Sequence, residues 1–286
     1  MRNKALPAPT EVLIFDCQES ESLPGKLVSN PGLSTDSVAK EVYSDTSLLV
    51  DFFRKCFGRN SIDDAGMGIV SSVHYSRSYV NAFWTGAQMV YGDGDGLIFK
   101  NMTSADDFIG HELQHGVTQH TAALIYEGEP GALNESMSDV FGSMFRQWKR
   151  SWDIGAADWI IGSELMGPTA IQMGWVCLRN LLDPSANSSL TKQPKHYKDY
   201  VQGGGPHDNS GIPNHAFYRA CSAVGGYSWE TVGLVWYAAI RSRHIKPNMK
   251  FKDFAALTCH EAKRIFPKNP SIATAVKEAW AAVGLR

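Results

Sequence analysis

Residues 111–115 read HELQH, with two histidines four positions apart and a glutamate directly after the first. On an α-helix, residues four apart lie about 40° from each other around the axis, so the imidazoles of His111 and His115 can reach one ion. Glu112 then lies beside that ion without having to bind it. This arrangement is typical of sites where zinc acidifies a water molecule and a carboxylate takes its proton. We therefore predict a zinc-binding helix that supports hydrolysis.

A second acidic segment provides the third ligand. Nineteen residues separate His115 from Glu135, and Asp139 follows four positions later. Residues 131–145 mix small and apolar side chains at helical spacing, so we expect Glu135 and Asp139 on one face of a helix. A catalytic zinc takes three protein ligands and keeps one position open, and His111, His115 and Glu135 supply that set.

The surroundings of these ligands refine the prediction. Asn134 and Asp139 are placed to hydrogen-bond the outer nitrogens of the ligating histidines, which fixes the tautomer and orientation of each ring. Metzincins are excluded, because they place a third histidine six residues after the second, and Thr121 stands there. His120 lies five residues beyond His115, about 140° around the helix, so we interpret it as a surface or packing residue.

Over its wider length the sequence resembles the thermolysin family of neutral zinc metallopeptidases, and most of all the shorter, protealysin-like members. The resemblance runs from about Val12 to the C-terminus. Besides HELQH, it is carried by these segments in order: Asn81 to Trp84, Gln88 to Gly96, Leu124 to Tyr126, Asn134 to Gly142, and Asp208 to Asn214. Several ordered motifs are far more specific than the pentapeptide alone.

The resemblance implies an α+β fold of two lobes with the zinc cleft between them. A β-rich N-terminal lobe, residues 1–122, would carry a substrate edge strand and lead into the HELQH helix. A mainly α-helical lobe, residues 123–286, would carry the third ligand and His207. Sequence periodicity agrees with this division. It predicts strands at 11–15 and 67–75 and helices at 36–57 and 271–284.

The same resemblance assigns roles in catalysis. Glu112 matches the base that deprotonates the attacking water and passes the proton to the departing amine. Tyr126 and His207 match the two donors that stabilise the oxyanion. On residue type alone, Tyr126 would more often be a core tyrosine and His207 a loop histidine. No covalent intermediate is needed, so the sequence requires no serine or cysteine nucleophile.

Substrate binding is implied in the same way. Asn81 and Ala82 match an edge strand that pairs with an extended peptide, and Arg179 matches an arginine that binds a carbonyl just past the scissile bond. Four apolar residues match the main specificity pocket: Phe99, Met102, Phe108 and Leu178. We expect cleavage before an apolar residue such as leucine, phenylalanine or isoleucine. Met102 and Phe108 are bulkier than the aliphatic residues often found there, so we expect a shallower pocket.

The residues around His207 depart from the family pattern. Family members usually carry an aspartate five residues before this histidine, and Gln202 stands there. A neutral amide stabilises an imidazolium less well, so we expect lower activity or a shifted acid limb of the pH–rate profile. Asp208 would compensate if its carboxylate reached the ring.

A second departure concerns calcium. Asp107 remains from the family's double calcium site, and Asp153 persists nearby. Arg146, Ser151 and Ala156 stand where acidic ligands are expected. Hard cations need several oxygen ligands, so we predict a degenerate calcium site in which Arg146 pairs with Asp107. Calcium loops near the C-terminus are also not recognisable, so heat resistance is not implied.

Composition bounds the partners. The 286 residues suffice for one large or two medium domains. A net charge of −2 with 20% charged residues gives no sign of nucleic-acid or membrane partners. No apolar run approaches the ~18 residues of a membrane span. We expect a monomer with peptide or protein substrates, and a pro-segment or proteinaceous inhibitor as a further partner.

The compartment stays open. Residues 1–10 contain charges and two prolines but no apolar core, so they do not form a secretory signal peptide, whereas the resemblance favours a secreted enzyme. The five cysteines are widely spaced without a CxxC pair, which predicts mostly buried free thiols and leaves one or two disulfides open. They are Cys17, Cys56, Cys177, Cys221 and Cys259.

Two other functions remain as alternatives to a zinc endopeptidase. A zinc-binding pseudoenzyme would keep the fold and lose the chemistry, although every predicted ligand and catalytic group is present. A zinc aminopeptidase would require a free substrate N-terminus. A purely structural zinc site is disfavoured, because such sites are closed by four protein ligands.

Overall fold

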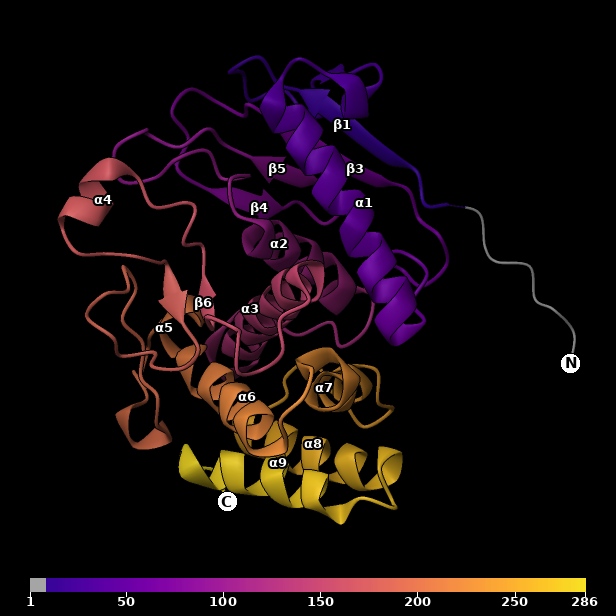
Figure 1. Cartoon of the computed structure of the whole chain (residues 1–286), viewed down its shortest axis with the longest axis vertical. Coiled ribbons are helices and arrows are strands. Elements are labelled where there is room, and N and C mark those ends of the chain that lie inside the picture. Colours follow the sequence, from indigo (N-terminus) through magenta and orange to yellow (C-terminus); the bar gives the residue numbers. More distant parts are fainter. Residues whose placement is uncertain (1–8) are drawn as a thin grey trace, which may run out of the picture.

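The computed structural model describes residues 9–286. Five strands form one sheet in the order β2-β1-β3-β5-β4. The strands are β1 Val12–Asp16, β2 Lys26–Leu27, β3 Ile69–Val73, β4 Ala82–Trp84 and β5 Met89–Tyr91. Strands β1, β3 and β5 run parallel, whereas the outer strands β2 and β4 run antiparallel to their neighbours. Strand β4 therefore forms one edge of the sheet (Figure 1).

Helix α1 (Ser37–Phe57) packs against this sheet (Figure 1). It begins after Asp36, whose carboxylate accepts the backbone N–H of Val38 at 3.0 Å. Its buried face includes Phe53, whose ring stacks on Phe141 of the neighbouring lobe with centroids 5.8 Å apart. Gly58 ends the helix with φ 66°, a left-handed conformation that glycine adopts without strain. The predicted helix is confirmed with a difference of one residue at its start.

Two long helices lie at the centre of the molecule (Figure 1). These are α2 (Asp106–Gln119), which contains HELQH, and α3 (Gly128–Arg150). Two glycines allow their close approach: a Cβ on Gly142 would lie 2.3 Å from the carbonyl oxygen of Asp107, and one on Gly110 would lie 3.0 Å from the Gly142 Cα. Any larger side chain at Gly142 would push the helices apart and separate the candidate ligands.

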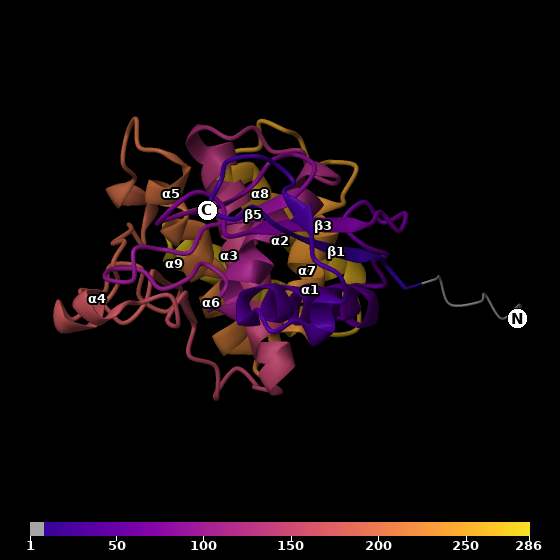
Figure 2. The ribbon, with the colours of Figure 1, turned by 90° about the horizontal axis from the view of Figure 1, so that it is seen from above.

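The remaining helices join α3 in the second lobe, and Figure 2 shows the molecule from above. They are α4 Pro168–Gln172, α5 Pro206–Asn209, α6 Gly211–Val224, α7 Val232–Ile240, α8 Phe251–Ile265 and α9 Pro270–Ala282. Apolar contacts join them, as in the parallel stacking of Trp236 on Trp280 with centroids 5.9 Å apart. A two-stranded antiparallel sheet of β6 (Ile160–Ile161) and β7 (Arg179–Asn180) also belongs to this lobe.

The expected fold class is confirmed: a lobe with a sheet is followed by a mainly helical lobe. Three short 3₁₀ helices complete the described elements, at Pro31–Leu33, Tyr197–Asp199 and Ser228–Glu230. The boundary expected at residue 122 falls in the connection between α2 and α3 and stays a prediction. All five cysteines are free thiols, and Cys17, Cys177 and Cys221 are buried. Between residues 9 and 286, no helix combines the length and apolar character needed to cross a membrane.

Candidate active site

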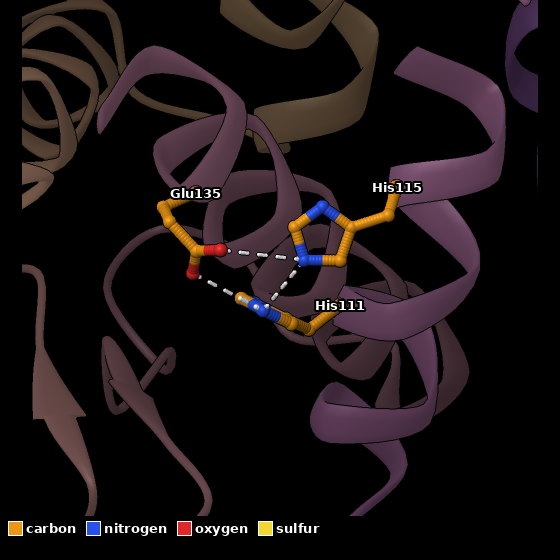
Figure 3. Close-up of side chains that lie close together, drawn as sticks. All are labelled: His111, His115 and Glu135. Atoms are coloured by element: carbon orange, nitrogen blue, oxygen red, sulfur yellow. Dashed lines mark hydrogen bonds and ion pairs between the residues drawn. The ribbon is translucent and has the colours of Figure 1, made fainter. Parts of the chain in front are cut away.

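Three side chains from the two central helices converge on one point (Figure 3). Helix α2 provides His111 and His115, and α3 provides Glu135. The two Nε2 atoms lie 3.3 Å apart. Glu135 places Oε2 3.4 Å from Nε2 of His111 and Oε1 3.5 Å from Nε2 of His115. The predicted ligand set is therefore brought together with its donor atoms facing inward.

The outer nitrogens of both histidines are held by the predicted partners. Nδ1 of His111 donates to Oδ1 of Asp139 at 2.8 Å, and Nδ1 of His115 donates to Oδ1 of Asn134 at 2.9 Å. Each bond leaves the Nε2 lone pair directed at the common centre, which is the tautomer that a metal ligand needs. Phe108 further restrains His111, because their rings stack with centroids 5.6 Å apart.

Asp139 is itself fixed in place. Arg179 donates to both carboxylate oxygens, from Nε at 2.8 Å and from Nη2 at 2.6 Å. Asn214 adds a third bond from Nδ2 to Oδ2 at 2.8 Å. Although burial would raise the pKa of Asp139, Arg179 and the hydrogen bond from His111 hold it well below its usual range. Asp139 therefore remains a charged acceptor for His111. Asn214 lay within a segment that carried the family resemblance, but no role was predicted for it.

The residues present fit zinc. Glu135 is fully buried, and its Oε2 has no hydrogen-bond partner within residues 9–286. An uncompensated buried carboxylate oxygen is costly, so a cation is the natural complement. Ligands about 2.0–2.1 Å from a tetrahedral ion are about 3.3 Å apart, close to the separations between these donor atoms. Two imidazole nitrogens and a carboxylate are also a donor set that zinc prefers.

A cleft of about 740 Å³ opens above this centre. Every predicted site residue lines it except Asp139, which lies beneath His111. Glu112 is buried in its wall beside the candidate ligands. Burial raises the pKa of the Glu112 carboxyl and outweighs the opposing influence of His111 and His115.

Tyr126 and His207 both lie beside Glu135. The Tyr126 hydroxyl donates to Oε1 of Glu135 and lies 3.4 Å from Nε2 of His207. Nε2 of His207 lies 3.3 Å from Oε2 of Glu135. Partial burial and the charge of Glu135 raise the pKa of Tyr126, so the phenol keeps its proton and remains a donor. The two predicted oxyanion donors are therefore adjacent.

The carboxylate of Asp208 does not reach the ring of His207, so the condition for compensation is not met. Its Oδ2 accepts the backbone N–H of Gly205 at 2.6 Å, which caps the short helix α5 instead of reaching the ring of His207. Gln202 is exposed. Gln193 holds this segment instead: it is 3% exposed, and its Nε2 donates to the backbone carbonyl of His207 at 2.5 Å.

Sequence reasoning missed Gln193. A single glutamine in a loop carries no periodicity or motif spacing, and the partner of its side chain is fourteen residues away. The same amide nitrogen also donates to the Ser210 hydroxyl at 2.7 Å. This pair of bonds ties Gln193 to α5 at His207 and to Ser210 directly after it, so Gln193 supports the backbone that carries His207.

The predicted substrate residues also line the cleft. Strand β4 pairs with β5 on one side only, so the backbone of Ala82 lies on a free edge within the described sheet. Asn81 precedes the strand, and its carbonyl accepts the N–H of Gly92 at 3.0 Å. Arg179 is buried against Asp139 at the base of the cleft. Four apolar residues line the cleft, and their role as the specificity pocket stays a prediction: Phe99, Met102, Phe108 and Leu178.

An arginine occupies the region expected for calcium. Arg146 is 4% exposed, and its Nη1 lies 3.2 Å from Oδ2 of Asp107, so the predicted ion pair is present. Glu164 was not foreseen, yet it accepts from Nη2 of Arg146 at 2.7 Å. Asp106 and Asp158 lie within 3.5 Å of the same guanidinium. The loss of calcium binding itself stays a prediction.

Comparison with known proteins agrees with this geometry. The family model for the catalytic domain of thermolysin metallopeptidases matches residues 10–119, and the model for their alpha-helical domain matches residues 122–285. The chain belongs to the thermolysin family of metallopeptidases. It is 43% identical over 283 residues to an extracellular metalloprotease of Pectobacterium carotovorum subsp. carotovorum, covering 95% of this chain and 80% of that protein.

Two further relatives within the thermolysin family are similar along most of the chain. Protease PrtS of Photorhabdus sp. (strain Az29) is 38% identical over 286 residues, which cover 96% of this chain and 76% of that protein. Among solved structures, the precursor of protealysin, a metalloproteinase from Serratia proteamaculans, aligns with a TM-score of 0.92 at 40% identity. That alignment covers 100% of this chain and 91% of the precursor. The protein is thus a metallopeptidase, as its sequence predicted.

Proposed function

We propose that the protein is a zinc endopeptidase that hydrolyses internal peptide bonds before an apolar residue. One observation carries the proposal: His111, His115 and Glu135 converge within one cleft, with Glu112 beside them. Zinc held by these three residues would supply Lewis-acid chemistry and a more acidic water. The roles of the surrounding residues follow from where they lie.

Glu112 acts as the general base and then as the general acid. It takes a proton from the attacking water and returns that proton to the amine as the peptide bond breaks. Burial raises the pKa of Glu112, which brings the carboxyl closer to the range where both transfers are efficient.

Tyr126 and His207 bind the oxyanion. Their polar atoms lie 3.4 Å apart on one side of the centre, so a single oxygen placed between them would accept from both. Each preorganised donor of this kind contributes about 10²–10³ in rate. Tyr126 must first exchange Glu135 for the substrate oxygen as its acceptor. Gln193 supports the position of His207 by donating to its backbone carbonyl.

The substrate lies along the free edge of β4 as an extended strand. Backbone pairing with Ala82 and Asn81 holds it without regard to side chains, whereas the apolar pocket selects the residue after the cut. Phe99 and Leu178 line the cleft and belong to this apolar pocket. Arg179, already fixed by Asp139, presents its remaining donor capacity to a carbonyl past the cut. Leucine, phenylalanine and isoleucine are the expected residues at that position.

We further propose that the protein acts outside the cell, with peptides and proteins as substrates. The name of the Pectobacterium relative, an extracellular metalloprotease, supports this location. A pro-segment is the proposed partner, in keeping with the precursor form of the protealysin structure. We expect the active form to be a monomer.

Digestion of two peptide libraries by the zinc-loaded protein, one end-blocked and one with free N-termini, tests the proposal when the cuts are mapped by mass spectrometry. Cuts before leucine, phenylalanine or isoleucine within blocked peptides are expected. Cleavage only of peptides with a free N-terminus would indicate an aminopeptidase. Absence of cleavage from both sets, with zinc bound, would indicate a pseudoenzyme.

A further inference from the structure

An exposed apolar surface lies at one rim of the cleft. It consists of Leu97, Ile171, Met173 and Val176, and we call these four residues the rim patch. Their exposed fractions are 60%, 56%, 57% and 51%, respectively. The chain from Leu165 to Leu178 contains no charged residue. Water therefore meets an uncharged and largely apolar segment, which is the usual mark of a binding surface.

The rim patch continues the wall of the cleft outward. Phe99 lines the cleft two residues after Leu97, and Leu178 lines it two residues after Val176. Figure 1 shows α4, which contains Ile171, standing clear of the helical core at the level of strand β4. Residues 97–99 and 176–178 therefore each contribute one residue to the specificity pocket and one residue to the rim patch.

Backbone contacts make this rim a fixed surface. The carbonyl oxygen of Leu97 accepts the N–H of Thr169 at 3.0 Å, and that of Ile98 accepts the N–H of Gly167 at 2.8 Å. A Cβ on Gly167 would lie 2.3 Å from the Leu97 oxygen, so only glycine permits this approach. Leu97 and the start of α4 are therefore held together before any ligand arrives.

We propose that the rim patch binds apolar side chains of the substrate about three to five residues past the cut. This inference rests on the proposed function, in which Phe99 and Leu178 receive the residue directly after the cut. An extended chain advances about 3.3 Å per residue, and the patch lies beyond Phe99 and Leu178, outside the lining of the cleft. The substrate is the natural occupant, because the patch is continuous with the cleft that receives it. Its apolar, uncharged character selects apolar side chains.

Two series of end-blocked peptides test this inference. Both carry leucine after the cut, and positions three to five past the cut hold leucine in one series and serine in the other. Burial of about 50–60 Å² of apolar surface corresponds to about tenfold in an equilibrium constant, so kcat/KM should be about tenfold higher for the apolar series. A double variant, Ile171→Ser with Met173→Ser, should lose most of this preference and cleave the serine series at the wild-type rate.

Leu33→Ser provides the matched control, since Leu33 is 86% exposed and lies outside the cleft lining. It should retain the tenfold preference. The inference is overturned if the wild type cleaves both series equally, or if the double variant slows both series alike. Dimers that dissociate in the double variant would reassign the patch to self-association. A zinc-loaded wild type that cleaves neither series would refute the proposed function itself, and this inference with it.

Discussion

Replacement of Arg146 by methionine should strongly destabilise the protein. The guanidinium is 4% exposed and faces Asp107, which is fully buried. Removing one partner of a buried ion pair costs about 3–5 kcal/mol, because the other charge stays buried without compensation. The Gly162 N–H, 3.1 Å from Oδ1 of Asp107, offsets only part of this loss. At about 2–4 °C per kcal/mol for chains of about 200 residues, the melting temperature should fall by roughly 10 °C.

Urea and thermal unfolding, followed by circular dichroism, would measure this effect. Arg150→Met is the matched control: its side chain is 31% exposed, and its contacts to Asp106 and Glu164 are 3.5 and 3.3 Å. Pairs of this kind contribute at most about 1 kcal/mol. Adding Asp107→Asn to Arg146→Met should restore part of the stability, because a neutral amide is less costly to bury. Equal losses from Arg146→Met and Arg150→Met would refute this reasoning.

The ion pairs of Arg146 also predict that calcium is not required for stability. Arg146 already supplies positive charge to Asp107 and Glu164, so no divalent ion is needed to neutralise them. A calcium-selective chelator, used with zinc in excess, should leave the melting temperature of the wild type unchanged. A large drop would show that calcium still binds there or elsewhere.

Two further predictions concern single side chains. Hydrogen bonds to Asp93 raise the pKa of His74 to about 9, so the charged imidazole contributes stability that is complete below pH 6.5 and is lost as pH rises through about 9. Asparagine tolerates the left-handed φ of 54° at this position, so His74→Asn is a suitable variant. It should remove the pH dependence of the free energy of unfolding, measured by urea titrations between pH 6 and 10. An unchanged pH dependence would exclude His74 as its source. Gln193→Leu should lower kcat about 10- to 100-fold with little change in KM, because His207 is displaced from the oxyanion. In a His207→Ala background the same substitution should have no further effect, and an undiminished effect there would reduce Gln193 to a purely structural role.

The long elements and the ligand set could be predicted because their signals are local. HELQH places two ligands on one helix by spacing alone, and α1 has an Asp36 cap, an apolar stripe and a terminal Gly58. The fold class then followed from the order of the family motifs. The two-residue strands β2, β6 and β7 were not predicted, because so short a strand has no periodicity to detect.

The missed contacts depend on tertiary structure. Glu164 and Arg146 form a hydrogen bond although they are eighteen residues apart in the sequence. Gln193 binds a backbone carbonyl, which any residue type provides. Neither contact therefore produces a pattern in the sequence. Asp208 does not reach the ring of His207 for a local reason. Its carboxylate accepts the N–H of Gly205 within its own turn. Such short-range hydrogen bonds compete with contacts to residues farther away, here the ring of His207.

We expect Glu112 to move the proton in a zinc-dependent peptide hydrolysis. The most direct measurement is the rate at which Glu112→Gln cleaves an end-blocked peptide, compared with the wild type at equal, verified zinc content. Loss of a general base costs about 10²–10⁴ in rate, so the variant should bind zinc normally and cleave at least 100-fold more slowly. A zinc-loaded variant that cleaves at nearly the wild-type rate would exclude Glu112 as the general base.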